Sequence, residues 1–428
     1  MVPEIEKKSQ AEILSFQEEK LREQLQFVNA HSPFYKRLFK EKKVDINAIK
    51  QLKDLTNIPV TTKTDLQQYN NDFFCVDKQE LIDLSSTSGT TGAPINFGLT
   101  DKDLDRLAYN EAISFACAGI TKADTVQLMT TMDRRFMAGL AYFLGLRKLG
   151  ASVIRTGAGV PALQWESIIN NKPSYLIVVP SFLLKMISYA ENKGIDLNST
   201  SVKAAICIGE PLRNQDFTPS TLAKRINNKW NIKLYSTYAS TEMSTAFTEC
   251  EHQVGGHAHP ELIITEVLDE NNQPVQKGEI GELTVTTLGN EGLPLVRFKT
   301  GDLVQIHNEP CQCGRNTHRV GPVLGRAQQM IKFKGTTLFP PAIHDVINNF
   351  DTVSGHIIIL KQDDVGNDDV LVKIVSKDSS EEFLRQLKEE FQAKVRVIPN
   401  IEFITSEELN SLLISASSRK PNFVIDLR

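Results

Sequence analysis

Asp83-Leu-Ser-Ser-Thr-Ser-Gly-Thr-Thr-Gly-Ala-Pro94 is the most distinctive stretch of this 428-residue chain. Its centre consists of small hydroxyl residues and glycines: Ser86, Thr87, Ser88, Gly89, Thr90, Thr91 and Gly92. Such a loop presents hydroxyls and backbone N–H groups to phosphate oxygens, and glycine permits a close approach. It is not a Walker A loop, because the glycines are too close together and no Gly-Lys-Ser/Thr follows. The stretch therefore predicts a phosphate-binding loop, and a flexible linker is the alternative.

Short apolar segments alternate with a helical pattern beyond this loop. Strands are predicted at residues 175–179, 204–208 and 232–235. Between the first two, apolar residues from 182 to 190 share one helical face, and Gly194 marks the end of that helix. Strands separated by helices predict an α/β fold with a substantially parallel sheet. Open sheets of this kind bind ligands at the carboxyl ends of their strands.

The two ends of the chain differ in character from this middle part. Residues 4–40 have helical spacing, and the chain becomes strand-rich after about residue 260. The last hundred residues predict a compact α+β unit, with Ser379 and Glu382 as a capping box for its helix. We therefore expect two domains, residues 1–326 and residues 327–428.

Composition and charge are those of an ordinary globular protein. Hydrophobic residues make up 41% of the chain and charged residues 23%, and the net charge is −4. No global positive field points to nucleic acid, and no apolar run reaches the length of a membrane span. The N-terminal residues lack the apolar core of a signal peptide, so we expect a cytoplasmic protein with neither nucleic acid nor membrane as partner.

Several spaced motifs together resemble one known family. Ser86 to Gly92 with Pro94 resembles the phosphate loop of the adenylate-forming superfamily, and the closest match within it is the phenylacetate-CoA ligase family. His31-Ser-Pro-Phe-Tyr35 and Ile58-Pro-Val-Thr-Thr-Lys-Thr-Asp-Leu66 resemble that family's N-terminal pattern. The resemblance runs nearly end to end. It implies a large N-terminal α/β domain that binds ATP and the acid, and a small, mobile C-terminal α+β domain.

The segment Tyr235-Ser-Thr-Tyr-Ala-Ser-Thr-Glu-Met243 is similar to the family's Tyr-Gly-x-Ser/Thr-Glu motif. By that match, Tyr238 stacks on adenine, Thr241 contacts phosphate and Glu242 binds Mg²⁺. Magnesium prefers oxygen ligands, so a carboxylate fits that role. Ala239 stands where the family usually has glycine.

Two further motifs resemble the family's nucleotide contacts. Gly209, Glu210 and Pro211 follow a predicted strand and match a turn beside the adenine, although an ordinary turn has the same sequence. Asp302 matches an aspartate that accepts hydrogen bonds from both ribose hydroxyls, which suits a carboxylate. Arg326 matches an arginine over the ribose and the phosphates.

The C-terminal part matches the family with departures. Ala327-Gln-Gln329 stands where acidic hinge residues usually follow, so the hinge residue stays open. Gly335-Thr-Thr-Leu-Phe-Pro340 resembles a loop that moves to the active site for the thioester step. Lys420 matches a lysine whose charge stabilises the transition state at the α-phosphate; its alternative is a solvated tail lysine.

The acid-binding pocket is predicted around Thr131-Met-Asp-Arg-Arg-Phe-Met-Ala-Gly139, where relatives have a segment lining an aryl site. Phe136 is the candidate for stacking on an aromatic ring. Arg134 and Arg135 are unusual there. They either meet a polar ring substituent or belong to a solvated loop.

Six cysteines are too few for a disulfide scaffold in a chain of this length. Cys250, His257, Cys311 and Cys313 form a candidate Zn²⁺ site, in a pattern that some relatives share. His252 and His259 are rival ligands, and reduced thiols without metal are the alternative. With four protein ligands, such a zinc ion would have a structural role.

The resemblance implies an ATP- and Mg²⁺-dependent ligase. It activates a carboxylic acid, which we expect to be aromatic, as an acyl adenylate and then forms a thioester with coenzyme A. One alternative acceptor is the phosphopantetheine of a carrier protein. Another alternative is a non-catalytic nucleotide-binding relative. Because relatives are often dimers, a homodimer is compatible with the resemblance.

Overall fold

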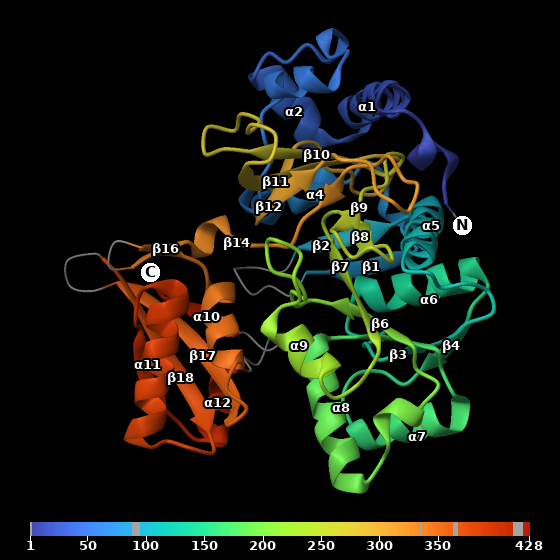
Figure 1. Ribbon diagram of the computed structural model, residues 1–428. Helices are drawn as coiled ribbons and strands as arrows, with labels where there is room; N and C mark the ends of the chain where they lie inside the picture. The colour runs from blue at the N-terminus through green and yellow to red at the C-terminus, as the bar shows by residue number, and fades with distance from the viewer. Residues whose placement is uncertain (1, 88–94, 334–335, 363–366, 414–422) are drawn as a thin grey trace. The chain divides into compact units, whose positions relative to one another are not determined.

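The computed structural model describes residues 2–87, 95–333, 336–362, 367–413 and 423–428 (Figure 1). The chain forms two units. The large unit comprises Met1–Thr87, Pro94–Thr300 and Val304–Pro322, and the small unit comprises Ser88–Ala93, Gly301–Leu303 and Val323–Arg428. The domain boundary after residue 326 stays a prediction.

Five parallel strands form the centre of the large unit's sheet. In spatial order they are β4 (Ser152–Arg155), β3 (Thr125–Leu128), β5 (Tyr175–Val178), β6 (Ala204–Ile208) and β7 (Lys233–Ser240). Every residue of β5 and β6 is buried. Strands with helices on both faces are buried on both sides, which explains their uninterrupted apolar sequences. The predicted parallel α/β sheet is confirmed.

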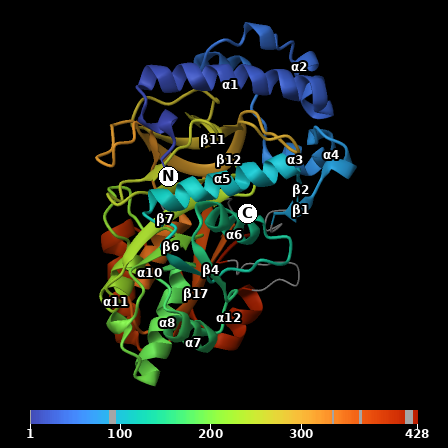
Figure 2. The same cartoon turned by 90° about the vertical axis from the view of Figure 1, so that its right-hand side faces the viewer.

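Helices cover both faces of these strands (Figures 1 and 2). On one face, α5 (Asp101–Cys117) and α6 (Met137–Leu149) pack on a cluster that includes Val126, Leu128, Tyr142 and Leu146. On the other face lie α7 (Pro161–Asn171), α8 (Pro180–Lys193) and α9 (Thr221–Asn227), around Trp165, Leu183, Met186 and Trp230. The predicted end of α8 at Gly194 is confirmed, since Gly194 has the left-handed conformation that favours glycine (φ +66°).

The sheet continues beyond β7 with antiparallel pairings. In spatial order these strands are β8 (Thr245–Glu249), β9 (Gly256–His257), β13 (Arg319–Val320), β12 (Phe298–His307), β11 (Ile280–Thr287) and β10 (Ile263–Leu268). The N-terminal helix α1 (Gln10–His31) lies across the β10 end (Figure 2), where the Gln17 amide donates to the carbonyls of Pro260 and Ile263. The strand-rich character predicted after residue 260 is confirmed.

Shorter elements join α1 to the phosphate-loop region. They are η1 (Glu4–Lys7) before α1, and then α2 (Pro33–Glu41), η2 (Ile46–Ala48), η3 (Leu52–Asn57), α3 (Lys63–Gln68), α4 (Asn70–Phe73) and η4 (Lys78–Glu80). The hairpin of β1 (Asp83–Ser86) and β2 (Asn96–Leu99) follows, and η5 (Leu197–Ser199) lies after α8. Helices over residues 4–40 were predicted and are confirmed. Among the described helices, none is long and apolar enough to cross a membrane.

The small unit is an α+β structure, as predicted. Its sheet has the order β19 (Asn400–Phe403), β18 (Asp368–Ser376), β17 (Val353–Gln362), β20 (Val424–Asp426). Its other elements are β14 (Gly325–Arg326), η6 (Ala327–Gln329), the hairpin β15 (Ile331–Phe333) and β16 (Thr336–Leu338), and the helices α10 (Pro340–Asn348), α11 (Glu381–Val395) and α12 (Ser406–Leu413).

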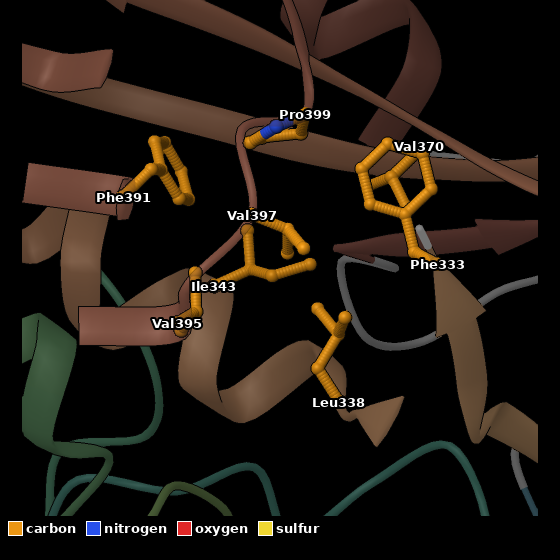
Figure 3. A pocket seen from close by; sticks show the side chains of 8 residues that line it. All are labelled: Phe333, Leu338, Ile343, Val370, Phe391, Val395, Val397 and Pro399. Carbon is orange, nitrogen blue, oxygen red and sulfur yellow. The ribbon is translucent and has the colours of Figure 1, made fainter. Parts of the chain in front are cut away.

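Apolar side chains from the hairpin, from α10, α11 and β18, and from the segment after α11 converge in one cluster of the small unit. Figure 3 shows Phe333, Leu338, Ile343, Val370, Phe391, Val395, Val397 and Pro399 around it. No polar side chain lines this cluster among the described residues. The cluster therefore belongs to the hydrophobic core of the small unit and offers no chemistry of its own.

The predicted capping box of α11 is wrong by one residue. The N-cap is Ser380, whose hydroxyl accepts the Phe383 N–H at 3.1 Å, in place of Ser379 with Glu382. The Asp378 carboxylate accepts the Ser380 N–H at 2.9 Å. This Asx-type turn directs the chain into the helix one residue later than the sequence pattern indicates.

Candidate active site

The carboxyl ends of β3, β5, β6 and β7 lie at one edge of the sheet, because these strands are parallel. Four segments follow them: residues 129–136, 179–181, 209–211 and 241–244. Phe136, Gly209, Glu210, Pro211, Thr241 and Glu242 were predicted from separate motifs, and the fold brings them to this edge, with Tyr238 near the end of β7 itself. Ligands bind at such an edge in open α/β sheets.

The base of the predicted phosphate loop is held closed. The Thr87 N–H donates to the Ile95 carbonyl at 3.0 Å, and the Ile95 N–H donates to the Thr87 hydroxyl at 3.0 Å. The Ser86 N–H donates to the Arg135 carbonyl at 3.1 Å, so the loop begins beside the segment after β3. Ser88, Gly89, Thr90, Thr91 and Gly92 lie outside the described residues.

The segment after β3 has an unusual backbone. Arg134 and Arg135 are both left-handed, with φ of 57° and 59°, a conformation that costs free energy in residues other than glycine. Its turn is held by the Phe136 N–H, which donates to the Asp133 carbonyl at 3.1 Å, and by the Thr131 hydroxyl, which donates to the Asp133 carboxylate. The hydrogen bond from Thr131 holds the pKa of Asp133 below its usual range.

Two residues near this segment were not predicted from the sequence. A Cβ on Gly139 would lie 2.0 Å from the Thr131 carbonyl oxygen, so only glycine lets α6 begin against the segment. The buried Thr130 hydroxyl has no hydrogen-bond partner among the described residues. Thr130 lies two residues beyond the end of β3, just before the turn at Asp133. No pattern in the sequence indicates that the hydroxyl of a threonine just after a strand will be buried without a partner.

The hairpin of β7 and β8 presents the predicted adenine and metal residues. Tyr238 pairs with Phe247 across the two strands, and their rings stack with centroids 5.9 Å apart at 18°. Thr241 and the half-buried Glu242 lie in the turn, where the Ser244 N–H donates to the Thr241 carbonyl at 3.3 Å. Phe247 therefore fixes the ring of Tyr238 beside the turn that carries Glu242.

Glu210 makes contacts that its motif did not predict. Its carboxylate accepts the backbone N–H and the hydroxyl of Ser181, both at 2.8 Å. Ser181 lies in the first turn of α8, whose N-cap Val179 has no side-chain cap. Glu210 thus caps α8 from the end of the neighbouring strand, where a carboxylate also suits the positive end of the helix. Burial raises the pKa of Glu210, against the hydrogen bonds from Ser181.

Asp302 and Arg326 are adjacent within the small unit. They pair across β12 and β14, and Arg326 Nε lies 3.2 Å from Asp302 Oδ1. Asp302 is buried, whereas Arg326 is exposed. Lys420 lies outside the described residues. The Val-Ile-Asp segment that follows it forms β20, which pairs in parallel with β17.

Four candidate metal ligands lie together in the large unit. Cys250 follows β8, His257 lies on β9, and Cys311 and Cys313 lie in the turn between β12 and β13. Their ligand atoms all lie within 4.8 Å of one another. The Cys250 and Cys311 sulfurs are 3.6 Å apart, and Cys313 Sγ lies 3.5 Å from His257 Nε2. The hydrogen bond from the Cys250 thiol, with those from His257 and Arg315, holds the pKa of the Cys313 thiol well below its usual range.

The rival histidines point to other partners. His259 is buried between Glu6, at 2.6 Å from Nδ1, and Ser114, at 3.1 Å from Nε2. His252 lies 3.8 Å from the exposed Glu251. The candidate ligands that lie together are thus Cys250, His257, Cys311 and Cys313. Three thiols and one imidazole match the donors of a closed tetrahedral zinc site.

This metal cluster lies away from the candidate active site. β8 separates the turn that carries Glu242 from Cys250, and its five residues span about 17 Å in extended conformation. A metal ion at the cluster therefore has no direct contact with a nucleotide at the carboxyl edge of the sheet.

Comparisons with known proteins agree with this geometry. Residues 7–290 match the family model described as AMP-binding enzyme. The chain is 30% identical to a phenylacetate-coenzyme A ligase of Thermus thermophilus, over 91% of this chain and 86% of that protein. It is 29% identical to a phenylacetate-coenzyme A ligase of Escherichia coli K12, over 88% of this chain and 85% of that protein.

Among solved structures, the chain is similar to 2-hydroxyisobutyryl-CoA ligase. Against that enzyme in its postadenylation state with 2-HIB-AMP, the TM-score is 0.86 at 25% identity, with 100% of this chain and 92% of that chain covered. Against the same enzyme with 2-HIB-AMP and CoA in its thioesterification state, the TM-score is 0.72 at 25% identity, with 99% and 91% covered.

Proposed function

The chain belongs to the AMP-binding enzyme family, and on this premise we propose that it is an AMP-forming acid–thiol ligase of the phenylacetate-CoA ligase type. It activates a carboxylic acid with ATP and transfers the acyl group to coenzyme A. The observation that carries this function is the similarity to such ligases along most of the chain. The gathering of Phe136, Tyr238, Thr241 and Glu242 at one edge of the sheet supports it.

The reaction has two steps. First, a carboxylate oxygen of the acid attacks the α-phosphorus of ATP, an acyl–phosphate bond forms, and pyrophosphate leaves. Second, the sulfur of coenzyme A attacks the acyl carbonyl carbon, a carbon–sulfur bond forms, AMP leaves, and the thiol proton passes to solvent. Neither step needs a nucleophilic side chain, so positioning and electrostatic stabilisation supply the rate.

The nucleotide contacts are assigned as the motifs imply. Residues 86–92 and Thr241 bind the phosphates, and the closed base of the loop between Thr87 and Ile95 supports that role. Tyr238 stacks on adenine beside residues 209–211. Asp302 binds the ribose hydroxyls, next to Arg326.

Two charged side chains act on the phosphates. Glu242 offers a carboxylate in the turn after β7, which is the kind of ligand that Mg²⁺ prefers, and the ion supplies positive charge near the phosphates. Lys420 places a point charge where the attacking carboxylate meets the α-phosphate.

The acid is aromatic in this proposal, with Phe136 against its ring. Thr130 lies in the same segment after β3 as Phe136, and its buried hydroxyl has no partner among the described residues, so a substrate with a hydrogen-bonding substituent would satisfy it. We expect the enzyme to act in the cytoplasm without nucleic acid or membrane as partner, and a homodimer is compatible with the family.

A second proposal concerns the metal cluster. Cys250, His257, Cys311 and Cys313 fit a structural Zn²⁺ that joins the end of β8 to the turn between β12 and β13. Because four protein ligands leave no open position, the ion contributes stability and no catalysis. Metal analysis of the purified protein tests this, and about one zinc per chain is expected. A protein that binds no zinc even after zinc is added back to the metal-free form contradicts the proposal.

Pyrophosphate release with Mg·ATP tests the main proposal. A panel of aryl acids, ring-hydroxylated aryl acids and short aliphatic acids is assayed with and without coenzyme A. Release that requires an acid, accelerates with coenzyme A and yields a thioester supports the ligase. Release that stops after one turnover until a carrier protein is added assigns the acceptor to that protein. ATP binding without release across the panel indicates a non-catalytic relative and overturns the proposal.

A further inference from the structure

Arg315 connects the metal cluster to the N-terminus of the chain. Its Nη1 lies 3.5 Å from the sulfur of Cys313, and its Nε donates to Glu6 Oε2 at 2.8 Å. Both side chains are buried, at 5% and 0% exposure. A buried guanidinium needs such partners, and here they are a cysteine sulfur on one side and a carboxylate on the other.

Glu6 is held from its second oxygen as well. His259 Nδ1 lies 2.6 Å from Glu6 Oε1, and His259 Nε2 lies 3.1 Å from the hydroxyl of Ser114 on α5. The chain Cys313–Arg315–Glu6–His259–Ser114 therefore runs from the half-buried Cys313 through four buried side chains. A carboxylate fixed at both oxygens holds the guanidinium in one orientation.

The same two segments are joined through the backbone. The Asn316 N–H donates to the Glu6 carbonyl at 2.7 Å, and the Asn316 amide donates to the carbonyls of Lys7 and Lys8, both at 3.1 Å. The turn that carries Cys311 and Cys313 is thus fastened to the residues just before α1. Since more than three hundred residues separate them in sequence, this contact is a tertiary one.

Charge explains why an arginine stands here. Three thiolates and a neutral imidazole carry one more negative charge than Zn²⁺ neutralises, and a buried net charge is costly unless it is paired. The Arg315 guanidinium supplies the opposite charge beside Cys313. Side chains that hydrogen-bond to the ligands of a metal orient those ligands, and their loss weakens metal binding about 10- to 100-fold.

From this arrangement we propose that Arg315 is a positioning residue of the metal cluster, that Glu6 holds it in place, and that metal binding and docking of the N-terminal segment are therefore coupled. The inference rests on the proposed zinc site. The metal fixes Cys313, Cys313 fixes Arg315, and Arg315 fixes Glu6 at the entry to α1. In the other direction, a docked Glu6 keeps Arg315 oriented towards the sulfur.

Zinc affinity of variants tests the positioning role. The dissociation constant is measured by competition with a chromogenic chelator. Arg315→Gln is expected to weaken zinc binding about 10- to 100-fold. Arg315→Lys is expected to weaken it less, because lysine keeps the positive charge. Glu6→Gln is also expected to weaken zinc binding, because Arg315 loses the carboxylate that holds it. Arg297→Gln is the matched control, since Arg297 is another buried arginine paired with a carboxylate, Glu266 at 3.0 Å. It is expected to lower stability without changing zinc affinity.

Hydrogen exchange of the wild-type protein tests the coupling. Chelation of zinc is expected to increase exchange in residues 4–8 as well as around Cys311. If Arg315→Gln fails to fold, Arg315→Lys and Glu6→Gln carry the test. Zinc affinity within twofold of wild type in the folded variants, or exchange of residues 4–8 unchanged by chelation, overturns the inference. A wild-type protein that binds no zinc refutes the metal proposal itself and leaves the ligase proposal untouched.

Discussion

The carboxylates of the large unit's candidate active site differ in their surroundings, and so do the consequences of removing them. Glu242 is half-buried in the turn after β7. Glu210 is bound at the first turn of α8 by both the N–H and the hydroxyl of Ser181. The first side chain is the proposed Mg²⁺ ligand, and the second holds two segments of the protein together.

Glu242→Gln is expected to reduce pyrophosphate release by about 10²- to 10³-fold, the scale of losing one electrostatic contact to a transition state. Because Glu242 is only half-buried and lies in a turn, the melting temperature is expected to change by no more than a degree or two. Initial rates at several Mg²⁺ concentrations and a thermal melt measure both effects. Full activity at saturating Mg²⁺ refutes the assignment of Glu242 as metal ligand.

Glu210→Ala is expected to act mainly on stability. It leaves the Ser181 N–H and hydroxyl without their acceptor, which costs about 1–3 kcal/mol. Chemical denaturation followed by circular dichroism gives the free energy of unfolding. Glu191→Ala, at an exposed salt bridge with Lys229, is the control, and its effect is expected to stay below about 1 kcal/mol. Unchanged stability with lost ATP affinity indicates a direct role of Glu210 in nucleotide binding.

Glu111 predicts a pH dependence of stability. This carboxyl is buried on α5, where burial raises its pKa to about 8 against the hydrogen bond from Asn110. The folded state therefore keeps the proton up to about pH 8, while the unfolded state loses it near pH 4.5. The stability contribution of the protonated group is complete below the unfolded pKa and is lost as pH rises towards the folded pKa. Glu111→Gln is expected to be more stable than wild type at pH 8.5 and similar at pH 5, as measured by urea unfolding.

Thr130 bears on the choice of acid. With a ring-hydroxylated acid and its deoxy analogue, Thr130→Val is expected to lower kcat/KM about 10-fold for the hydroxylated acid only, since one hydrogen bond contributes about 1 kcal/mol or slightly more. Thr130→Ser keeps the hydroxyl and is expected to keep the preference. Equal losses with both acids contradict a role in substrate recognition.

Among the elements, the parallel strands were predictable and the contacts at their ends were not. The apolar runs of β5 and β6 fix their burial on both faces, and Gly194 marks the end of α8 because few other residues adopt its conformation. The sequence also brought Cys250, His257, Cys311 and Cys313 together as one set. The choice among the histidines required the fold, because the partner of His259 is Glu6, far away in the sequence.

Other site features depend on tertiary contacts that leave no local pattern. The capping of α8 by Glu210 joins the segments that follow β5 and β6. From the sequence, residues 209–211 are equally consistent with a turn that contacts a nucleotide. The hydroxyl of Thr130 is buried without a partner among the described residues, which depends on the groups that the fold brings around it. The N-cap of α11 is Ser380 and not the predicted Ser379, because the Asp378 carboxylate accepts the backbone N–H of Ser380 and directs the chain into the helix one residue later.

For the whole molecule, the assignment of residues divides the reaction between the two units. Of the residues proposed to contact the nucleotide, Thr87, Tyr238 and Glu242 belong to the large unit, whereas residues 88–92, Asp302, Arg326 and Lys420 belong to the small unit. If Lys420 stabilises only the transition state of adenylate formation, then the two half-reactions must respond differently to its loss. A single substitution can therefore test the division of labour.

Lys420→Ala is expected to reduce acid-dependent pyrophosphate release by at least about 10²-fold, because it removes a charge that opposes the growing negative charge at the α-phosphate. Thioester formation from a supplied acyl adenylate and coenzyme A is expected to stay within a few-fold of wild type. Lys377→Ala, at an exposed position of the same unit, is the control for general loss of charge. If the rates of both half-reactions fall together, Lys420 holds the structure of the small unit. If neither rate falls, Lys420 is a solvated lysine. Only a loss of adenylate formation with thioester formation retained is explained by a charge that acts in the first step.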